Sequence, residues 1–209
     1  MCSKIKTLYR KYEHDRIHQG DLLTDVDVPI ILYSNEEPTL DIITFQYGLV
    51  LSQDCDLEGA KWLHLSIQKK GHFDEEDPIK GNSFLPSIII APAFIADNVR
   101  VGDYLSPLGF KMVHKGRSDS TTWSKIESNN DPRYHFIGEF KDDLKIPPLV
   151  VDFKIFYTVP YEYIYAEYGH DTIYSLNELF REDLSQRFFN FHSRIGLPLL
   201  EEDSNCEEL

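Results

Sequence analysis

The apolar residues of this chain fall into short runs separated by turn-forming residues, and this spacing constrains the fold more than any other feature. Such runs, bounded by Gly, Pro, Asn, Asp and Ser, are typical of β-strands. A sustained helical period begins only after Pro160. The pattern therefore predicts a sheet-based fold that ends in a helix. The expected strands are residues 25–33, 47–52, 62–68, 87–91, 133–140 and 149–159.

One hairpin stands out among these strands. Residues 47–52 (YGLVLS) are apolar, residues 62–68 (WLHLSIQ) alternate, and the connection between them, QDCDLEGA, is short and polar. This arrangement predicts that the two runs pair as antiparallel neighbours. Pro29, inside the first expected strand, indicates an edge strand or a bend. The polar residues 35–41 are expected to form a second hairpin loop, and residues 115–131 an exposed insertion.

The clearest helix is expected over residues 174–194. Ser175 is a candidate N-cap with Glu178 three residues later, and Gly196 followed by Pro198 would end the helix. The apolar positions that follow one helical face are Leu176, Leu179, Phe180, Leu184, Phe188 and Phe191.

These elements together predict an α+β fold. We expect a small, strongly bent antiparallel β-barrel, SH3-like in character, with an insertion and a C-terminal helix. Residues 1–18 are interpreted as an amphipathic N-terminal helix or arm, and residues 19–198 as a single barrel-based domain. Residues 199–209 carry five acids without periodicity and are expected to be a disordered tail.

Composition and charge narrow the classes of partner. The 209 residues are 42% hydrophobic, which is enough to build a core. The formal net charge is −14, from 21 basic and 35 acidic side chains. Such a charge repels phosphate backbones and anionic lipid, so direct binding to nucleic acid or to a membrane surface is disfavoured. A basic protein is the partner that this charge favours.

The cysteines and the apolar segments indicate a cytoplasmic protein. Cys2, Cys55 and Cys206 lie far apart without a zinc-type spacing, which is typical of reduced thiols. The N-terminal residues lack the apolar region of a secretion signal. The most apolar stretch, residues 88–96, is interrupted by Pro92 and is too short to span a bilayer.

The densest polar cluster follows the YGLVLS strand and contains Gln53, Asp54, Cys55 and Asp56. A thiol beside carboxylates could be a nucleophile, but a nucleophilic cysteine needs a nearby cation, histidine or helix N-terminus. Negative neighbours have the opposite effect. We therefore favour the interpretation that the two aspartates are turn and capping acceptors and that Cys55 packs as a small hydrophobe.

Neither a metal site nor a cofactor is expected. His14, Asp15 and His18 form H-D-x-x-H, which resembles the zinc-protease motif, but two histidines do not complete a zinc shell. The sequence also lacks a phosphate-binding loop, a dinucleotide glycine fingerprint and a G-x-S-x-G turn.

A second polar set comes from two later strands. Asp152 lies in an apolar strand and needs a cation, for which Arg133 is the first candidate and Arg194 the alternative. The favoured interpretation is a structural ion pair between Arg133 and Asp152. The catalytic alternative has Asp152 orient His135 as a general base beside Asp54, Cys55 or Asp56.

The segment VPYEYIYAEYG, residues 159–169, is a candidate protein-binding patch because tyrosine is enriched at interfaces. Its predicted contact residues are Tyr161, Tyr163 and Tyr165, which would act together with Gln53, Asp54 and Asp56.

Five segments in order carry a resemblance to a known family: Gly20-Asp21, LSQDCDL (residues 51–57), RYHF (133–136), VVDF (150–153) and FHSRIGLP (191–198). Together they resemble a scattered prokaryotic family of uncharacterised proteins, over roughly residues 19–198. The S-Q-x-C-D-L segment is its most specific element. The resemblance implies a bacterial or phage origin near mobile-element or antiviral genes, and it implies no activity.

The Gly-Asp start and the apolar GLVLS strand are also similar to the SH3-like barrels of the Kid and MazF toxin ribonucleases. Their catalytic residues do not carry over, because this chain has Gln46 and Tyr47 where those toxins place an arginine and a proline. The favoured function is a non-enzymatic, protein-binding accessory or regulatory module of a prokaryotic, defence-linked complex. The alternative is a hydrolase-type enzyme that uses an Asp/Cys/His site.

Overall fold

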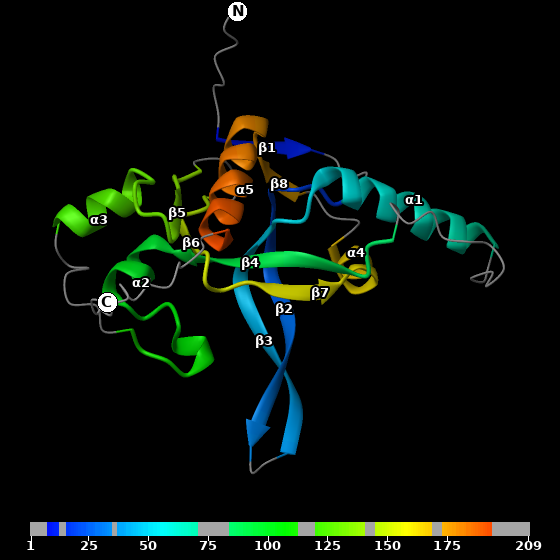
Figure 1. The fold of residues 1–209 in the computed structure, drawn as a ribbon, viewed down its shortest axis with the longest axis horizontal. Coiled ribbons are helices and arrows are strands. Elements are labelled where there is room, and N and C mark those ends of the chain that lie inside the picture. Colours follow the sequence, from blue (N-terminus) through cyan, green and yellow to red (C-terminus); the bar gives the residue numbers. More distant parts are fainter. Residues whose placement is uncertain are drawn as a thin grey trace, which may run out of the picture.

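The computed structural model describes residues 8–12, 16–34, 37–70, 84–112, 120–140, 145–168 and 173–193. These residues form a mixed α+β structure in which every strand pairing is antiparallel. The predicted α+β class is confirmed. Figure 1 shows the arrangement of the elements.

An eight-stranded sheet organises the molecule, in the order β1-β8-β2-β3-β4-β6-β5, with β7 also paired to β4. Within the described residues no pairing joins β1 to β5, so the sheet is not closed. The strands are β1 (Tyr9–Tyr12), β2 (Asp21–Ser34), β3 (Glu37–Val50), β4 (Ser87–Ile95), β5 (Tyr134–Ile137), β6 (Leu149–Asp152), β7 (Tyr157–Pro160) and β8 (Ile173–Leu176).

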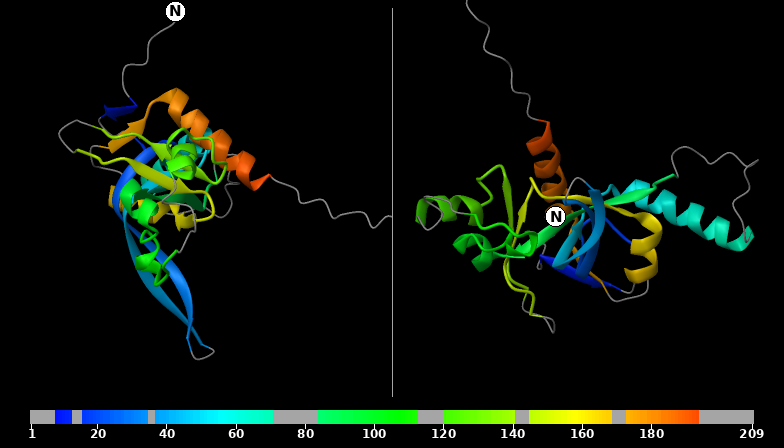
Figure 2. Two further views of the ribbon diagram at one scale, coloured as in Figure 1. Left: turned by 90° about the vertical axis from the view of Figure 1, so that its left-hand side faces the viewer. Right: turned by 90° about the horizontal axis from the view of Figure 1, so that it is seen from below.

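Helices pack on both faces of the sheet. On one face, Leu184 and Phe188 of the last helix pack with Leu49, Ala91 and other strand residues. On the other face a larger cluster gathers side chains from the remaining α-helices against β2, β3 and β4. The helices are α1 (Asp54–Lys70), α2 (Ala96–Val101), the 3-10 helix η2 (Ser106–Leu108), α3 (Ser120–Glu127), α4 (Tyr161–Tyr168) and α5 (Glu178–His192). Figure 2 shows α1 and α3 at opposite ends of the molecule.

The predicted hairpin between residues 47–52 and 62–68 is wrong, because residues 62–68 belong to α1. Seven alternating residues are compatible with a strand or a helix, and the structure is decided by the residues before them. Asp54 and Asp56 favour a helix start through the helix dipole, and Leu57 and Ala60 are both buried three residues apart.

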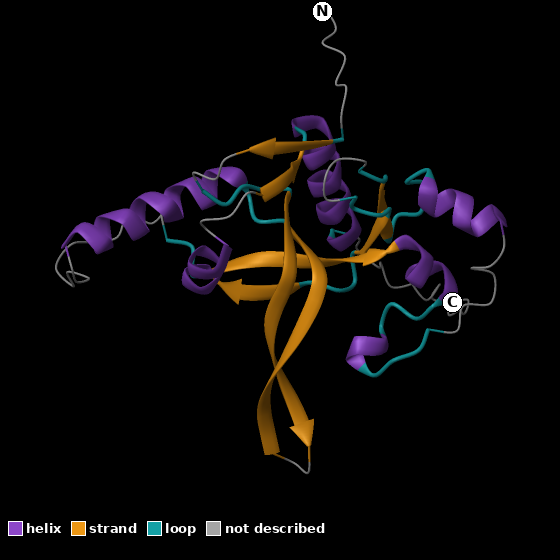
Figure 3. Cartoon of the chain, turned by 180° about the vertical axis from the view of Figure 1, so that it is seen from behind, coloured by secondary structure: helices purple, strands orange, loops and turns teal. Residues whose placement is uncertain are grey.

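The hairpin that does form joins β2 to β3. The two strands pair from Leu22–Leu49 to Ser34–Glu37, so most of the polar segment at residues 35–41 is strand. We call residues 26–34 and 37–45 the β2–β3 arm. It extends as a twisted ribbon away from the other elements (Figures 1 and 3). At Pro29, β2 pairs with β3 alone among the described strands. Pro29 therefore lies at an edge of the sheet, as predicted.

The N-terminal helix is also wrong for the described residues, since Tyr9–Tyr12 form β1 and pair with β8. Tyr9 is buried against the sheet, and this contact outweighs the weak helical spacing. His18 lies in the turn before β2 instead of on a helix, while His14 and Asp15 lie outside the described residues.

The C-terminal helix is confirmed, with a later start than expected. Residues 173–176 form β8, whose Ser175 and Leu176 are buried, and α5 begins after Asn177, which is its N-cap. Sheet pairing therefore overrides the helical period at these positions. Arg194, Gly196, Pro198 and the tail at residues 199–209 lie outside the described residues.

Two further boundaries differ from the expectation. The single strand expected over residues 149–159 is divided into β6 and β7, and the backbone amide of Ile155 donates to the Asp152 carbonyl in the turn between them. The insertion expected over residues 115–131 contains α3, whose Trp123 and Ile126 are buried in the core. Among the described residues no helix is long and apolar enough to cross a membrane.

Candidate functional site

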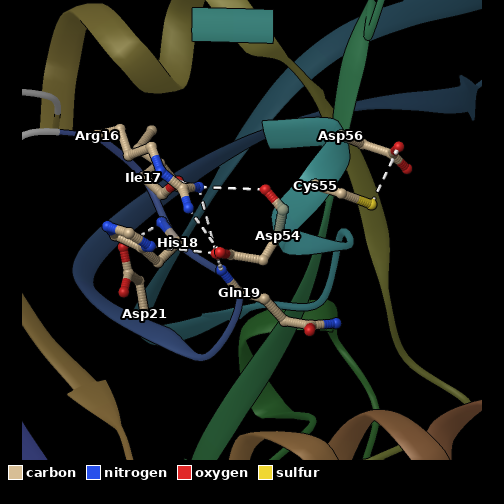
Figure 4. Close-up of polar contacts among 8 residues, drawn as sticks. All are labelled: Arg16, Ile17, His18, Gln19, Asp21, Asp54, Cys55 and Asp56. Atoms are coloured by element: carbon tan, nitrogen blue, oxygen red, sulfur yellow. Dashed lines mark hydrogen bonds and ion pairs between the residues drawn. The ribbon is translucent and has the colours of Figure 1, made fainter. Parts of the chain in front are cut away.

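The first candidate site lies where α1 begins, at Asp54. Its carboxylate accepts hydrogen bonds from Arg16 Nη2 at 2.5 Å and from the Gln19 backbone amide at 3.2 Å, and His18 Nδ1 lies 3.1 Å from Oδ1 (Figure 4). Arg16 Nη1 also donates to the Asp54 backbone carbonyl at 3.2 Å. These contacts fasten the segment before β2 to the first turn of α1.

Burial by itself raises the pKa of Asp54, but hydrogen bonds from His18 and Arg16 and the Arg16 charge lower it well below its usual range. The carboxylate is therefore ionised at neutral pH. Because its oxygens already accept four hydrogen bonds from three neighbours, Asp54 is an internal anchor. The prediction that it contacts a partner has no support in this geometry.

The residues on either side of Asp54 are exposed. Cys55 lies on the surface, which corrects the expectation that it packs as a small hydrophobe. Its Sγ donates to Asp56 Oδ1 at 3.6 Å and to Gln53 Oε1 at 3.7 Å, so the thiol has carboxylate and amide acceptors as partners. Neither neighbour is a histidine or a cation, so of the three activating features only the N-terminus of α1 is present at Cys55. Among the described residues no group of three or more His, Cys, Asp or Glu side chains could hold a metal ion.

Arg133 and Asp152 form the ion pair that their sequence context predicted. Asp152 is fully buried, and it accepts hydrogen bonds from Arg133 Nε at 2.8 Å and from Arg133 Nη2 at 2.6 Å. Tyr104 adds a hydroxyl donor at 2.8 Å and Lys154 a backbone amide at 3.1 Å. Both carboxylate oxygens of Asp152 accept hydrogen bonds and most of the ion pair is buried. The pair therefore has a structural role.

His135 lies apart from this pair. Tyr134 is the residue that faces Asp152 across β5 and β6, whereas His135 faces Val151 and therefore points to the opposite side of the sheet. The catalytic hypothesis in which Asp152 orients His135 is wrong for this reason. Burial and the charge of Arg187 lower the pKa of His135 to about 3, so its imidazole is neutral.

The residues of the hydrolase alternative do not converge. Within the described part of the chain, no hydrogen bond or ion pair joins His135 to Asp54, Cys55 or Asp56. His135 Nδ1 lies 3.9 Å from the Asp183 carboxylate. A nucleophile, a base and an orienting acid are therefore not assembled in one place.

The tyrosine-rich segment forms α4, which packs beside α1. His64 Nδ1 of α1 lies 2.6 Å from Glu162 Oε2 of α4, and the His64 and Tyr165 rings are 4.6 Å apart between centroids. Tyr161 is buried and burial raises its pKa, so it belongs to the core. Tyr163 and Tyr165 are half-buried and remain partly accessible. The two segments predicted separately as contact regions thus belong to two adjacent helices.

The sequence analysis missed the exposed apolar face of the β2–β3 arm. Ile31, Leu40 and Ile42 are among its exposed large hydrophobic residues. The signal was present in the unbroken run PIIL, residues 29–32, because a strand with only one buried face should alternate. From the sequence, that run was expected in an edge or bent strand, without a binding role.

Comparisons of the chain with protein-family models, with curated proteins and with solved structures found no match. The function is therefore argued from the geometry of the described residues.

Proposed function

We propose that the chain is a non-enzymatic protein-binding module, an accessory or regulatory subunit of a prokaryotic complex. The observation that carries this proposal is the contact of His64 with Glu162 and Tyr165, which brings α1 and the tyrosine helix α4 side by side. Partly accessible tyrosines on adjacent helices favour an interaction surface, because tyrosine is enriched at protein interfaces.

The proposed contact residues are those that the internal network leaves accessible. Gln53 and Asp56 are exposed at the start of α1, and Tyr163 and Tyr165 are half-buried on α4. Asp54 and Tyr161 are omitted because the first is an internal anchor and the second is core. Exposed acids on the two helices (Asp56, Glu58, Glu162 and Glu167) favour a partner with a basic surface.

We also propose that the domain is a variant of an SH3-like barrel, and the order of its strands supports this proposal. β2, β3 and β4 are consecutive antiparallel neighbours. The first part of β4 pairs with β7 and its last part pairs with β6. Because no pairing joins β1 to β5 among the described residues, the proposed barrel is an open one. An experimental structure with a flat sheet would contradict this proposal.

The test of the function is a matched pair of variants of the full chain. The contact variant Asp56→Asn/Tyr163→Ser removes one exposed acid and one accessible aromatic ring. The control Asp97→Asn/Phe110→Ser makes the same kind of change at exposed positions far along the chain. Proteins that co-purify with the tagged chain are quantified, and the strongest is purified and its affinity measured.

We expect the contact variant to weaken that affinity at least tenfold, which is about 1.4 kcal/mol, and the control to leave it unchanged. Binding should also weaken with added salt, since the attraction is between charges. A purified partner that binds both variants equally would refute the proposed surface. Turnover of a substrate that depends on Cys55 would refute the non-enzymatic assignment.

A further inference from the structure

The β2–β3 arm has no strand neighbours beyond its own two strands within the described residues. β2 pairs with β8 only through Asp21 and Leu22, and β3 pairs with β4 only from Gly48 to Val50. From residue 26 outward the two strands therefore bond only to each other. An isolated two-stranded ribbon is only marginally stable in water, so the arm depends on contacts of its side chains for stability.

One face of the arm is fastened to the core near its base. Val26, Val28 and Phe45 are buried in the larger cluster, and Ile30 and Ile43 are partly buried against it. Tyr168 adds a hydrogen bond from its hydroxyl to the Asp25 carbonyl at 2.9 Å. The base of the arm is therefore held in place while its outer part projects.

The other face carries an apolar stripe. Ile31 faces Leu40 and Pro29 faces Ile42 across the two strands, so these four side chains share one side of the ribbon. The exposed fractions are 70% for Ile31, 75% for Leu40 and 61% for Ile42. A contiguous exposed apolar stripe on a projecting element is typical of an interaction surface.

The charge around the stripe indicates what covers it. Residues 22–50, which include the arm, contain no Lys or Arg and five acids, namely Asp25, Asp27, Glu36, Glu37 and Asp41. A second copy of the chain placed on the stripe would bring two such acidic regions together, which is unfavourable. A basic surface would be attracted instead.

We propose that the Pro29/Ile31/Leu40/Ile42 stripe docks onto an apolar surface rimmed by Lys and Arg in a partner protein. The four stripe residues belong to β2 and β3, and none of them is an α1 or α4 contact residue, so this surface goes beyond the function proposed above. The apolar side chains supply the contact area, and acids such as Asp27, which lies on the stripe face opposite Thr44, supply the charge complementarity.

The experiment uses a defined probe, a fluorescein-labelled strand-forming peptide of alternating Leu and Lys, with a matched Leu and Glu peptide. The arm variant Ile31→Thr/Leu40→Thr/Ile42→Thr keeps β-branched or strand-compatible residues while removing the apolar surface. The control variant Val101→Thr/Leu179→Thr removes apolar surface of similar exposure elsewhere, 64% and 61%. Thermal unfolding confirms that each variant is folded.

We expect the Leu/Lys peptide to bind the wild-type chain and the control, to lose at least tenfold in affinity for the arm variant, and to weaken with added salt. Equal binding to the arm variant, or equal binding of the Leu/Glu peptide, would overturn the proposal. Sedimentation that showed a wild-type dimer broken by the arm variant would also overturn it, because the occupant would then be a second copy. The Asp56→Asn variant, which changes α1 alone, should bind the peptide like the wild type, so the two proposals fail separately.

Discussion

Asp54 and Asp56 are two positions apart but differ in their contacts and exposure. Asp54 stands at the first position of α1 and faces the segment before β2, where Arg16 and His18 bond to it. Asp56 is exposed and accepts a weak bond from the Cys55 thiol. The sequence indicates that acidic residues are favourable in the first turn of α1. It does not show which of the two aspartates binds Arg16, which lies 38 residues away from Asp54 in the sequence.

We predict that Asp54→Asn lowers the free energy of unfolding at pH 7 by about 1–2 kcal/mol, because charge-assisted hydrogen bonds to Arg16 are lost. The matched control Asp56→Asn should change it by less than about 0.5 kcal/mol, since an exposed side chain is replaced. Chemical denaturation of the three proteins measures both values. Equal effects of the two substitutions would contradict the role of Asp54 as an anchor.

The same carboxylate should respond to pH. Its pKa is lower in the folded chain than in the unfolded chain, where it is about 3.9. The stabilisation is therefore nearly complete above about pH 5 and is lost progressively as pH falls toward the folded-state pKa. The difference in unfolding free energy between wild type and Asp54→Asn should shrink below about pH 4, and a constant difference down to pH 2 would count against the Arg16 and His18 contacts.

At the scale of elements, the start of α1 explains why residues 62–68 were wrongly predicted to be a strand. Residues 62–68 alternate as a strand would, but they continue a helix that begins eight residues earlier, at Asp54. Helix formation is cooperative, so a good start propagates through a segment of ambiguous pattern. The strands expected at residues 87–91 and 133–140 correspond to β4 and β5. They could be predicted because their apolar runs are bounded by breakers and the preceding helices, α1 and α3, end at Lys70 and Glu127.

Two glycines that end short helices offer an element-scale prediction. Gly102 caps α2 and Gly109 caps η2, both with positive φ, at 85° and 76°. A Cβ at Gly102 would meet the Met112 carbonyl oxygen, whereas a Cβ at Gly109 has no neighbour within 4 Å. Gly109→Ala should therefore cost only the left-handed backbone penalty, about 1 kcal/mol.

Gly102→Ala should cost roughly 2–4 kcal/mol, because backbone displacement is added to that penalty. Thermal unfolding of the two alanine variants measures the difference. Similar midpoints for the two would show that the Met112 segment moves aside without cost.

At the scale of the whole molecule, the sequence sufficed for the α+β class, the C-terminal helix and the Arg133–Asp152 pair. It did not suffice for the partners of β1 and β8, because strand pairing between residues 9–12 and 173–176 has no local signal. The same limit applies to the site. Each candidate residue could be chosen by its type, but which face of a sheet it occupies, as for His135 and Asp152, depends on register.

The packing of α5 is predicted to hold that long-range pairing in place. Leu184 is 1% exposed and packs on the sheet, whereas Leu179 on the same helix is 61% exposed. Leu184→Ala should lower the free energy of unfolding by about 2–5 kcal/mol and Leu179→Ala by less than about 0.5 kcal/mol. Hydrogen exchange should also become faster at the β1 amides in Leu184→Ala, and unchanged exchange there would show that β1 does not depend on α5.

The position of β8 between β1 and β2 has a consequence for biosynthesis. The ribosome releases β1 and β2 long before residues 173–176 emerge, so this edge of the sheet can be completed only after β8 has been synthesised. During that interval the Gly20 carbonyl lacks the Leu176 amide, which is its donor in the folded chain. Chaperone occupancy on translating ribosomes should therefore persist until the codons for β8 and α5 have been read.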